Sequence, residues 1–485
     1  MKKTINCFVP FTEVAQAEET VKALRNTSLV NKIYLLTTES SEEKILGCEV
    51  LPVPTLHASA AMRVVASRSD TAYTLLYTKY TPLELGLFAL ERMVRILEDS
   101  GAGMVYADRY QIMGTDKKNA PVIDYQFGSL RADFDFGSLL FYKAEALKEA
   151  AGRMRADYNY AGLYDFRLKL SQKELPVHIN EYLYSERETD TRKSGEKIFD
   201  YVDPKNRGVQ IEMEQACIEH LKEISGYLPP RFEKIAFDAG NFAYEASVII
   251  PVRNRIRTIE DAIRSALSQK TTFKFNLIII DNHSTDGTTE AIQKYASDER
   301  LLHIIPERID LGIGGCWNVG VHHPNCGKFA VQLDSDDVYK DENTLQTMVN
   351  AFYEQNCAMV VGTYMMTDFD MNAIPPGIID HKEWTPENGR NNALRINGLG
   401  APRAFYTPVL REVKVPNTSY GEDYALGLNF SRYYQIGRVY DVVYLCRRWE
   451  GNSDASLDSI KTNAHNLYKD RIRTWELQAR IKINS

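Results

Sequence analysis

The sequence predicts an α/β protein made of two tandem domains, each built around a mainly parallel sheet. Two observations lead to this prediction. Short strand-like runs of β-branched and other apolar residues alternate with longer segments of helical periodicity. The order of these segments in the first half returns in the second half. The length agrees, because 485 residues exceed what one ordinary domain core holds.

The second half shows the alternation most clearly. Residues 246–252, ASVIIPV, have the composition of a buried parallel strand. The next segment, residues 258–269, carries its apolar residues at helical spacing. A later polar turn offers Thr285 or Asp286 as the N-cap of a second helix. Further strands are expected at residues 275–281, 301–305 and 329–333.

The two halves match segment by segment, which indicates a tandem duplication of one domain. A chance match between two unrelated α/β halves is the alternative. The offset between matching residues is 241 (Pro10 and Pro251), 244 (Thr37 and Asp281), 258 (Asp165 and Asp423) and 262 (Leu183 and Leu445). The predicted parts are a first domain at 1–225, a linker at 226–245 rich in proline and glycine, a second domain at 246–455 and a C-terminal amphipathic helix at 456–485.

Composition excludes several classes of protein. The formal net charge of −7 gives no sign of a nucleic-acid partner. Seven cysteines are odd in number and form no C-x-x-C pair, which argues against a disulfide framework or a zinc site and favours a cytoplasmic location. No apolar run is long enough to span a membrane, and the run before Pro10 is too short for a signal peptide.

One predicted strand runs directly into a cluster of acids. The stretch FAVQLDSDDVY, residues 329–339, places Asp334, Asp336 and Asp337 within four positions. Repulsion between such close carboxylates raises their pKa values unless a cation or hydrogen bonds compensate. The cluster therefore indicates a metal site, a set of backbone donors or a solvated turn.

Four motifs then carry a resemblance to a known family. SVIIPVRN, IIIDNHSTDGT, LDSDD and GEDYALGL follow one another in this order. Over roughly residues 246–453 the chain resembles the family 2 glycosyltransferases of the GT-A fold, which is Rossmann-like, and the first half resembles a diverged copy. This resemblance implies transfer of a hexosyl-type sugar, with inversion, from a nucleotide-diphospho-sugar to a hydroxyl of a glycan or lipid-linked acceptor. A UDP-sugar is favoured over a GDP-sugar.

The resemblance also implies roles for individual residues. Asp336 of the D-x-D motif would hold a divalent cation, Mn²⁺ or Mg²⁺, that bridges the donor's diphosphate. Asp423 would act as the general base that takes the proton from the acceptor hydroxyl, and Glu422 would orient the acceptor. The residues implied to contact the nucleotide-sugar are Pro251, Arg253, Asn254, Asp281, Asn318, Asp334, Ser335, Arg403, Arg447 and Trp449.

Structural interpretations compete with these roles. Asp281 could cap the turn into the next helix, and Glu422 and Asp423 could be favoured in a first helical turn by the helix dipole alone. Many relatives have a histidine near Trp449, which this chain lacks, so a third metal ligand is not identified; His465 is the nearest candidate. The glycine-rich loop GIGGCWNVGV lacks the spacing of a P-loop or a Rossmann fingerprint.

The first copy lacks most of the implied site. Alignment places Thr37 opposite Asp281, residues 77–79 (Tyr-Thr-Lys) opposite residues 334–336, and Asp165 opposite Asp423. A lysine at the metal position would repel a cation. The first domain is therefore predicted to be inactive and to serve as a scaffold, a dimerisation surface of a homo-oligomer or an acceptor platform.

The C-terminal segment is predicted to pack its apolar face against the second domain. Peripheral contact with an anionic membrane, on its inner face, is the alternative. The apolar face would consist of Ile460, Ala464, Leu467, Ile472 and Trp475.

Two other functions compete with transfer. A catalytically silent carbohydrate-binding or assembly protein is disfavoured because the second copy keeps its acids together. A sugar nucleotidyltransferase is disfavoured because the segment after the first strand of the second copy, PVRNRIRTIED, has no glycines.

Overall fold

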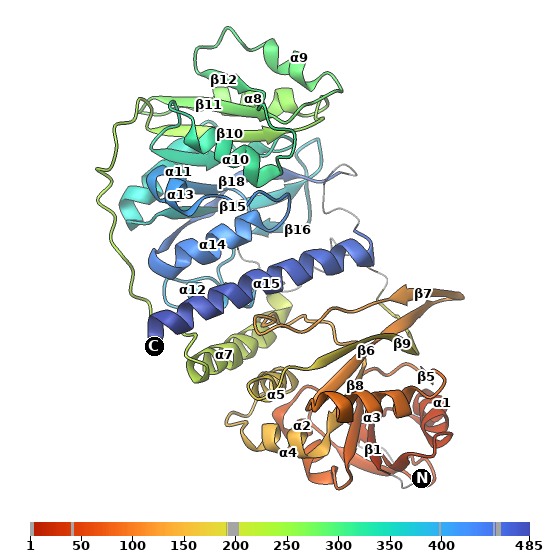
Figure 1. Cartoon of the computed structure of the whole chain (residues 1–485). Helices are drawn as coiled ribbons and strands as arrows, with labels where there is room; N and C mark the ends of the chain where they lie inside the picture. Colours follow the sequence, from red (N-terminus) through yellow and green to blue (C-terminus); the bar gives the residue numbers. More distant parts are fainter. Residues whose placement is uncertain are drawn as a thin grey trace. The chain divides into compact units, whose positions relative to one another are not determined.

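The computed structural model describes residues 4–39, 43–190, 192, 203–396, 399–449, 452 and 457–485. It divides into two units, one comprising Met1–Tyr227 with Leu457–Ser485 and the other Leu228–Ser456 (Figure 1). Each unit is a mixed sheet covered by helices, with four parallel strands in a row in its first half. The prediction of two tandem α/β domains is confirmed.

The first unit contains a nine-stranded sheet with the order β3-β2-β1-β4-β8-β6-β9-β5, and β7 pairs with β6. Its strands are β1 (Ile5–Pro10), β2 (Val30–Thr37), β3 (Glu49–Pro52), β4 (Tyr73–Tyr77), β5 (Leu83–Leu85), β6 (Met104–Met113), β7 (Asp116–Ala120), β8 (Leu139–Lys143) and β9 (Val177–Arg187). Its helices are α1 (Val14–Arg25), α2 (Ser59–Arg68), α3 (Ala89–Ser100), α4 (Ala144–Gly152), α5 (Gly162–Ser171), η2 (Pro204–Asn206), α7 (Arg207–Glu223) and α15 (Ser459–Asn484).

The second unit contains a nine-stranded sheet with the order β12-β11-β10-β13-β17-β15-β18-β14, and β16 pairs with β15. Its strands are β10 (Ala246–Val252), β11 (Phe275–Asp281), β12 (Leu301–Ile304), β13 (Phe329–Gln332), β14 (Val338–Tyr339), β15 (Met359–Thr367), β16 (Ala373–Ile379), β17 (Arg403–Tyr406) and β18 (Ile436–Arg447). Its helices are α8 (Ile259–Leu267), α9 (Thr288–Gln293), α10 (Ile313–His322), α11 (Thr344–Gln355), α12 (Gly389–Asn392), α13 (Thr407–Val413) and α14 (Glu422–Tyr433).

The two sheets have the same strand order, since each strand of the second takes the place of the strand nine numbers earlier in the first. The match includes the strand off the main path, β7 in one sheet and β16 in the other. Two unrelated α/β domains have no reason to agree in nine strands and their pairing. The topology therefore supports the tandem duplication.

Strand pairing shifts the predicted alignment at the acidic cluster by one residue. Phe8 of β1 lies opposite Leu76 of β4, and Ile249 of β10 lies opposite Gln332 of β13. Because Pro10 matches Pro251, Leu76 corresponds to Gln332. It follows that residues 78–80 (Thr-Lys-Tyr), rather than 77–79, correspond to residues 334–336. The first copy lacks the acids in either alignment.

The predicted match between Asp165 and Asp423 is wrong. Helix α5 begins at Gly162 and helix α14 begins at Glu422, so Asp165 corresponds to a residue two positions beyond Asp423. Asp165 lies inside the first unit, fully buried, with Lys169 at 3.8 Å. Burial raises the pKa of Asp165 to about 6. The first unit therefore keeps no acid at the position of the proposed base.

The last strand pair also has a different offset from the predicted one. Ile112 of β6 lies opposite Arg187 of β9, and Thr367 of β15 lies opposite Arg447 of β18. Arg187 therefore corresponds to Arg447, which gives an offset of 260 rather than 262. The predicted offset of 262 aligned the Tyr-Leu pair at residues 182–183 with the one at residues 444–445, but strand pairing does not place these two pairs at equivalent positions.

The C-terminal helix α15 belongs to the first unit. Ser129 Oγ donates a hydrogen bond to Asp470 Oδ2 at 2.9 Å, and Thr474 Oγ1 accepts one from the Gly128 N–H at 2.9 Å. The expectation that this helix packs on the second domain is therefore wrong.

The apolar face predicted for α15 is also wrong in part. Ile460 and Trp475 are 73% and 56% exposed, whereas Ile472 and Leu477 are buried. Apolar spacing did not predict the buried face of α15, because charged residues that pair with each other are also buried on it. These ion pairs are Asp470–Arg473 at 2.8 Å and Glu476–Arg480 at 2.7 Å.

The predicted linker, residues 226–245, contains no helix or strand, but from Leu228 onward it belongs to the second unit. Asn356 exchanges two hydrogen bonds with the backbone of Ile235, at 3.1 and 2.9 Å. Phe237 packs edge-on against Phe329.

None of the helices in the described ranges combines the length and the apolar character needed to cross a membrane.

Candidate active site

The carboxyl ends of β10, β11 and β13 lie next to one another and form one boundary of the second sheet. We call this boundary the edge; it is where these strands end, not an outer strand of the sheet. Strands β11 and β12 lie on one side of β10, and β13 lies on the other, so the strand order reverses beside β10. Open α/β sheets bind ligands at such a reversal, where the loops after the strands separate. The acidic cluster follows β13 and therefore lies at this edge.

Asp281 ends β11, and its carboxylate is fully enclosed. It accepts hydrogen bonds from the Ser284 N–H at 3.0 Å and the Thr289 hydroxyl at 2.5 Å, and His303 Nε2 is 3.5 Å away. Burial alone would raise the pKa of Asp281, but the nearby His303 imidazole and the two hydrogen bonds outweigh it and hold the pKa well below its usual range. The carboxylate thus organises the turn from β11 into α9. A direct nucleoside contact of Asp281 stays a prediction.

Asp334 is held from two sides. Gln332 Nε2 donates a hydrogen bond to Asp334 Oδ1 at 2.8 Å, and the Asp334 N–H donates to the Tyr444 hydroxyl at 3.0 Å. Burial raises the pKa of Asp334 above its usual range, and Asp336 adds to this effect against the opposing charge of Arg403. The neighbouring Ser335 is buried. Asp334 therefore carries charge that its surroundings compensate only in part.

Asp336 lies beside Trp449 at the same edge. Its Oδ2 accepts hydrogen bonds from Trp449 Nε1 at 3.2 Å and from Asn452 Nδ2 at 3.3 Å, and the Arg255 guanidinium is 3.9 Å away. The Asp336 side chain is 15% exposed, so it is accessible from outside. The structure thus brings together Asp336 and Trp449, which the sequence assigned to the metal and the donor sugar.

Arg447 supports the acidic loop from inside the fold. It is 1% exposed, its N–H donates to Asp337 Oδ1 at 2.8 Å, and its guanidinium donates to the Asp336 carbonyl at 2.6 Å and pairs with Asp261 at 2.7 Å. The predicted diphosphate contact does not fit this structure, because the guanidinium is enclosed and two of its three nitrogens are already bound. Burial, followed by Asp334 and Asp336, raises the pKa of Asp337 well above its usual range.

Two arginines that the sequence analysis did not assign lie over this region. The Arg257 guanidinium is 4.7 Å from the ring centre of Phe369 and 5.2 Å from that of Trp449. Arg255 lies 5.9 Å from the Trp449 ring. Arg253, Arg255 and Arg257 alternate in the segment after β10, and this spacing is the signal that could have identified them.

The proposed base, Asp423, is bound to an arginine. Arg403 Nη1 donates to Asp423 Oδ2 at 2.8 Å and to the Leu399 carbonyl at 2.8 Å. Burial would lower the pKa of Arg403, but Asp423, Asp334 and Glu422 together raise it above its usual value. Arg403 thus lies among the acids of both motifs, and Asp423 remains one-third exposed.

Glu422 is half-buried at the start of α14. Burial raises the pKa of Glu422 to about 7, and the adjacent Asp423 adds to the effect. Its Oε2 is buried, and within the described ranges it has no hydrogen-bond partner. A carboxyl group in this state changes its protonation near neutral pH.

The remaining predicted contacts near β10 differ in exposure. Pro251 is half-buried within the strand, whereas Arg253 and Asn254 are exposed in the following loop. Asn254 adopts φ 54° and accepts a hydrogen bond from the Thr285 N–H at 2.8 Å. These residues therefore border the turn after β11.

Asn318 and the glycine-rich loop have a packing role. Asn318 donates to the Val415 carbonyl at 2.7 Å and accepts from the Val415 N–H at 2.9 Å. A Cβ atom on Gly314 would lie 1.8 Å from the Pro416 carbonyl oxygen. The glycines thus allow α10 to approach this segment, which agrees with the rejection of a phosphate-binding loop. The nucleotide contact expected for Asn318 has no support in this geometry.

The donor set fits a divalent cation held mainly by substrate. The described ranges contain no group of three His, Cys, Asp or Glu side chains that could hold a metal ion. Mg²⁺ is commonly bound through one or two carboxylates together with substrate phosphates, so such a group is not required. Partly uncompensated charge on Asp334 and Asp337 beside Asp336 suits a cation at this point. His465, the other candidate ligand, belongs to α15 in the first unit.

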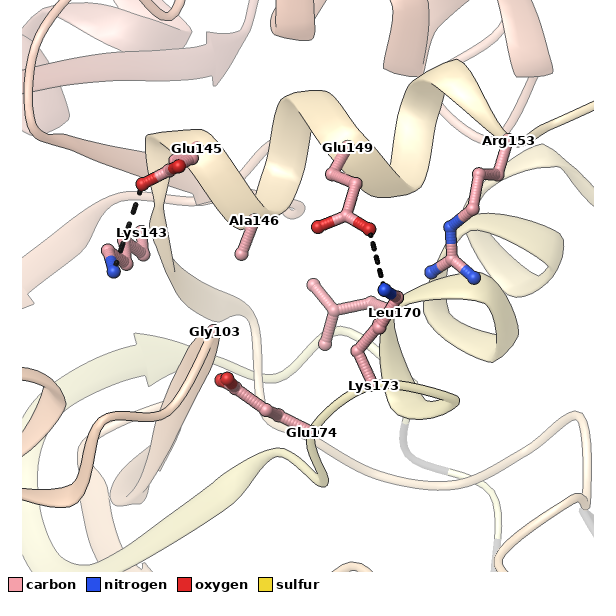
Figure 2. Close-up of a pocket in the computed structure, with 9 residues that line it drawn as sticks. All are labelled: Gly103, Lys143, Glu145, Ala146, Glu149, Arg153, Leu170, Lys173 and Glu174. Carbon is pink, nitrogen blue, oxygen red and sulfur yellow. Dashed lines mark ion pairs between the residues drawn. The ribbon is translucent and has the colours of Figure 1, made fainter.

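The first unit has a pocket lined by residues that include Lys143, Glu149 and Lys173 (Figure 2). Lys143 in its lining pairs with Tyr73 at the start of β4, so the pocket lies at the amino ends of the parallel strands. Its charges pair with one another, with Lys143–Glu145 at 3.9 Å and Lys173–Glu149 at 3.2 Å. This pocket shows no excess of one charge that would select a ligand.

Comparison with known proteins finds relatives of the second unit. Residues 247–409 match the family model for glycosyl transferase family 2. TuaG of Bacillus subtilis, a glycosyltransferase assigned to teichuronic acid biosynthesis, is 30% identical over 148 residues, which cover 30% of this chain and 58% of TuaG. TarS of Staphylococcus aureus, a poly(ribitol-phosphate) β-N-acetylglucosaminyltransferase, is 28% identical over 169 residues, which cover 34% of this chain and 28% of TarS.

A solved structure of S. aureus TarS 1–349 in complex with UDP-GlcNAc aligns with a TM-score of 0.38 and 22% identity, covering 49% of this chain and 72% of that one. The aligned regions thus span little more than half of TuaG and about a quarter of TarS. Within the second unit, residues 247–409 thus match the family model for glycosyl transferase family 2, and this region is similar to the glycosyltransferases TuaG and TarS.

Proposed function

We propose that the second unit transfers a sugar from a nucleotide-diphospho-sugar to a hydroxyl acceptor, with inversion and with a divalent cation. One observation carries the proposal. Arg403 binds Asp423 directly and is close enough to Asp334 for their charges to interact, so the donor-side and acceptor-side acids converge on one group. An inverting transfer needs both sides within one site, because the base must face the sugar opposite the leaving group.

The donor is proposed to lie along the edge from β11 to β13. The turn organised by Asp281 would border the nucleoside, and Arg255 and Arg257 would place positive charge beside the diphosphate. The indole of Trp449 would pack near the sugar or diphosphate. TarS has been observed with UDP-GlcNAc, so a UDP-sugar is the first donor to test.

The cation is proposed to bind at Asp336, with Asp334 adjacent. When bound, it would supply positive charge to the leaving nucleoside diphosphate. Trp449 and Asn452 hold Asp336 Oδ2, which orients the carboxylate for this role. Arg447 holds the loop backbone beneath it.

Asp423 is proposed as the group that accepts the proton of the acceptor hydroxyl. Its position at the start of α14 and its partial exposure make it accessible to an acceptor. Arg403 fixes its orientation through the hydrogen bond at 2.8 Å. Glu422 would bind the acceptor hydroxyl next to it. A glycan or lipid-linked hydroxyl is the proposed acceptor class.

Nucleotide release tests the proposal. Purified protein is incubated with Mn²⁺ and a panel of UDP- and GDP-sugars, and the freed nucleotide is measured. Turnover of at least one donor is expected, and Asp336→Ala should lower it on the order of 100-fold or more, because a metal contributes several kcal/mol of transition-state stabilisation. Glu354→Ala, on the exposed surface of α11, is the control and should keep the wild-type rate. Failure of every donor would favour a catalytically silent protein.

A further inference from the structure

We propose that Gln332 is a positioning residue that sets Asp334 and Arg403 together, so that the donor and acceptor sides of the site share one geometry. The inference rests on the proposed transferase function of the second unit. Gln332 is the last residue of β13, directly before the acidic loop, and no motif of the sequence pointed to it.

The side chain of Gln332 uses both ends of its amide. Its Nε2 donates to Asp334 Oδ1 at 2.8 Å, and its Oε1 accepts from the backbone N–H of Arg403 at 3.1 Å. Gln332 is 3% exposed, so these bonds form away from water. The Arg403 side chain then donates to Asp423 Oδ2 at 2.8 Å. A continuous path thus runs from one motif to the other.

The first unit shows what this strand position needs for folding alone. Leu76 corresponds to Gln332, is 4% exposed and pairs with Leu140 of β8 in a ladder that continues to Tyr77. In the second unit the β13–β17 ladder ends at Val331 and Ala404, and the Gln332 side chain takes the next N–H. A buried amide is costly unless its hydrogen bonds are made, whereas leucine carries no such cost. The fold therefore accepts an apolar residue here, and the amide serves the acids.

The two hydrogen bonds of Gln332 fix the Asp334 carboxylate relative to the backbone of Arg403. Removing them should misplace these groups and lower kcat more than it changes KM. A residue that only fills space would leave kcat unchanged.

The test replaces Gln332 with the residue of the first unit. In Gln332→Leu, kcat should fall by about 10- to 100-fold, because small misplacement of reacting groups has effects of this size. The KM for the donor should change much less than kcat, and the melting temperature should fall, because the backbone N–H of Arg403 loses its partner. Gln332→Met, close to glutamine in length, should give the same result and serves if the leucine variant does not fold.

Gln269→Leu is the matched control. Gln269 is also buried in the second unit, but it bonds Asp341, Ser265 and Leu345, which lie outside the proposed site. This variant should lower the melting temperature and leave kcat and KM in place. A Gln332→Leu protein with the wild-type kcat would overturn the inference. If the wild-type protein turns over no donor, the proposed function itself fails, which is a distinct result.

Discussion

The two units share one strand order but balance the charges at the equivalent edge in opposite ways. In the first unit, Lys79 pairs with Glu186 at 2.9 Å and with Glu188 at 3.3 Å, while Arg109 pairs with Glu186 at 2.8 Å and with Asp135 at 2.9 Å. The Arg109 guanidinium holds the pKa of Asp135 below its usual range. Each of these three acids at the first edge therefore has a cationic partner within its own unit.

The second unit leaves its edge short of positive charge. Asp334 and Asp337 have raised pKa values despite nearby Arg403 and Arg447. Two sheets with the same strand order can thus carry acids that are paired with cations, as in the first unit, or acids with too few cations, as in the second. Uncompensated carboxylates lower stability unless something else binds them. This difference is what is expected if the second edge binds a ligand and the first does not, as proposed.

The largest expected effect comes from comparing Asp423, at the start of α14, with Asp165 in the equivalent helix α5. Asp423→Asn should lower kcat by about 100-fold or more, because a general base contributes 10²- to 10⁴-fold. UDP affinity, measured by calorimetry, should change little, since Asp423 lies on the acceptor side. Asp165→Asn in the first unit should leave kcat unchanged. Loss of turnover in Asp165→Asn would mean that the first unit takes part in the chemistry.

A second prediction concerns pH. The pKa of Glu422 is about 7, so as pH rises through this value the group becomes a carboxylate that can accept a hydrogen bond from the acceptor hydroxyl. The rate of donor hydrolysis or transfer should rise with an apparent pKa near 7. This limb should disappear in Glu422→Gln. A wild-type limb that persists in the variant would exclude Glu422 as its origin.

A third prediction sharpens the comparison through stability. The folded pKa of Asp165 is raised to about 6, so its contribution to stability is present at low pH and is lost as pH rises through 6. Asp165→Asn should therefore match the wild type near pH 4 and exceed it at pH 7.5 by about 1–3 kcal/mol in the free energy of unfolding. Calorimetric melting of both proteins at the two pH values measures this. A variant that is less stable at pH 7.5 would contradict the prediction.

The smallest expected effect tests the paired edge of the first unit. Lys79→Ala removes one cation from Glu186, which is fully buried but keeps Arg109. The free energy of unfolding should fall by about 1–2 kcal/mol, because the lost pair is partly exposed. Donor turnover should stay at the wild-type rate. Reduced turnover with unchanged stability would assign the first edge a functional role.

Much of the fold was predictable because strand and helix periodicities are strong and the duplication presents them twice. The predicted alignment of the two halves was wrong by one or two residues where no distinctive motif fixed the register. Asp165 was matched to Asp423 as an acid near a helix start, but the helices begin at Gly162 and Glu422, and only the structure shows this. The location of α15 was missed because it buries paired charges, which an apolar pattern does not reveal.

The site was predictable where acids end a strand or begin a helix, as at Asp336 and Asp423. It was not predictable where a residue works through its partners. Gln332 resembles any polar residue in a strand until its two hydrogen bonds are seen. Arg447 was assigned to the diphosphate by its motif, although its guanidinium lies inside the fold.

The stoichiometry of nucleotide binding tests the central claim most directly. Titration calorimetry of the full chain with UDP and Mn²⁺ should give one site per chain, and Asp336→Ala should remove it. Two sites per chain, or one site that survives Asp336→Ala, would contradict the account, because either result would mean that the first unit binds the nucleotide.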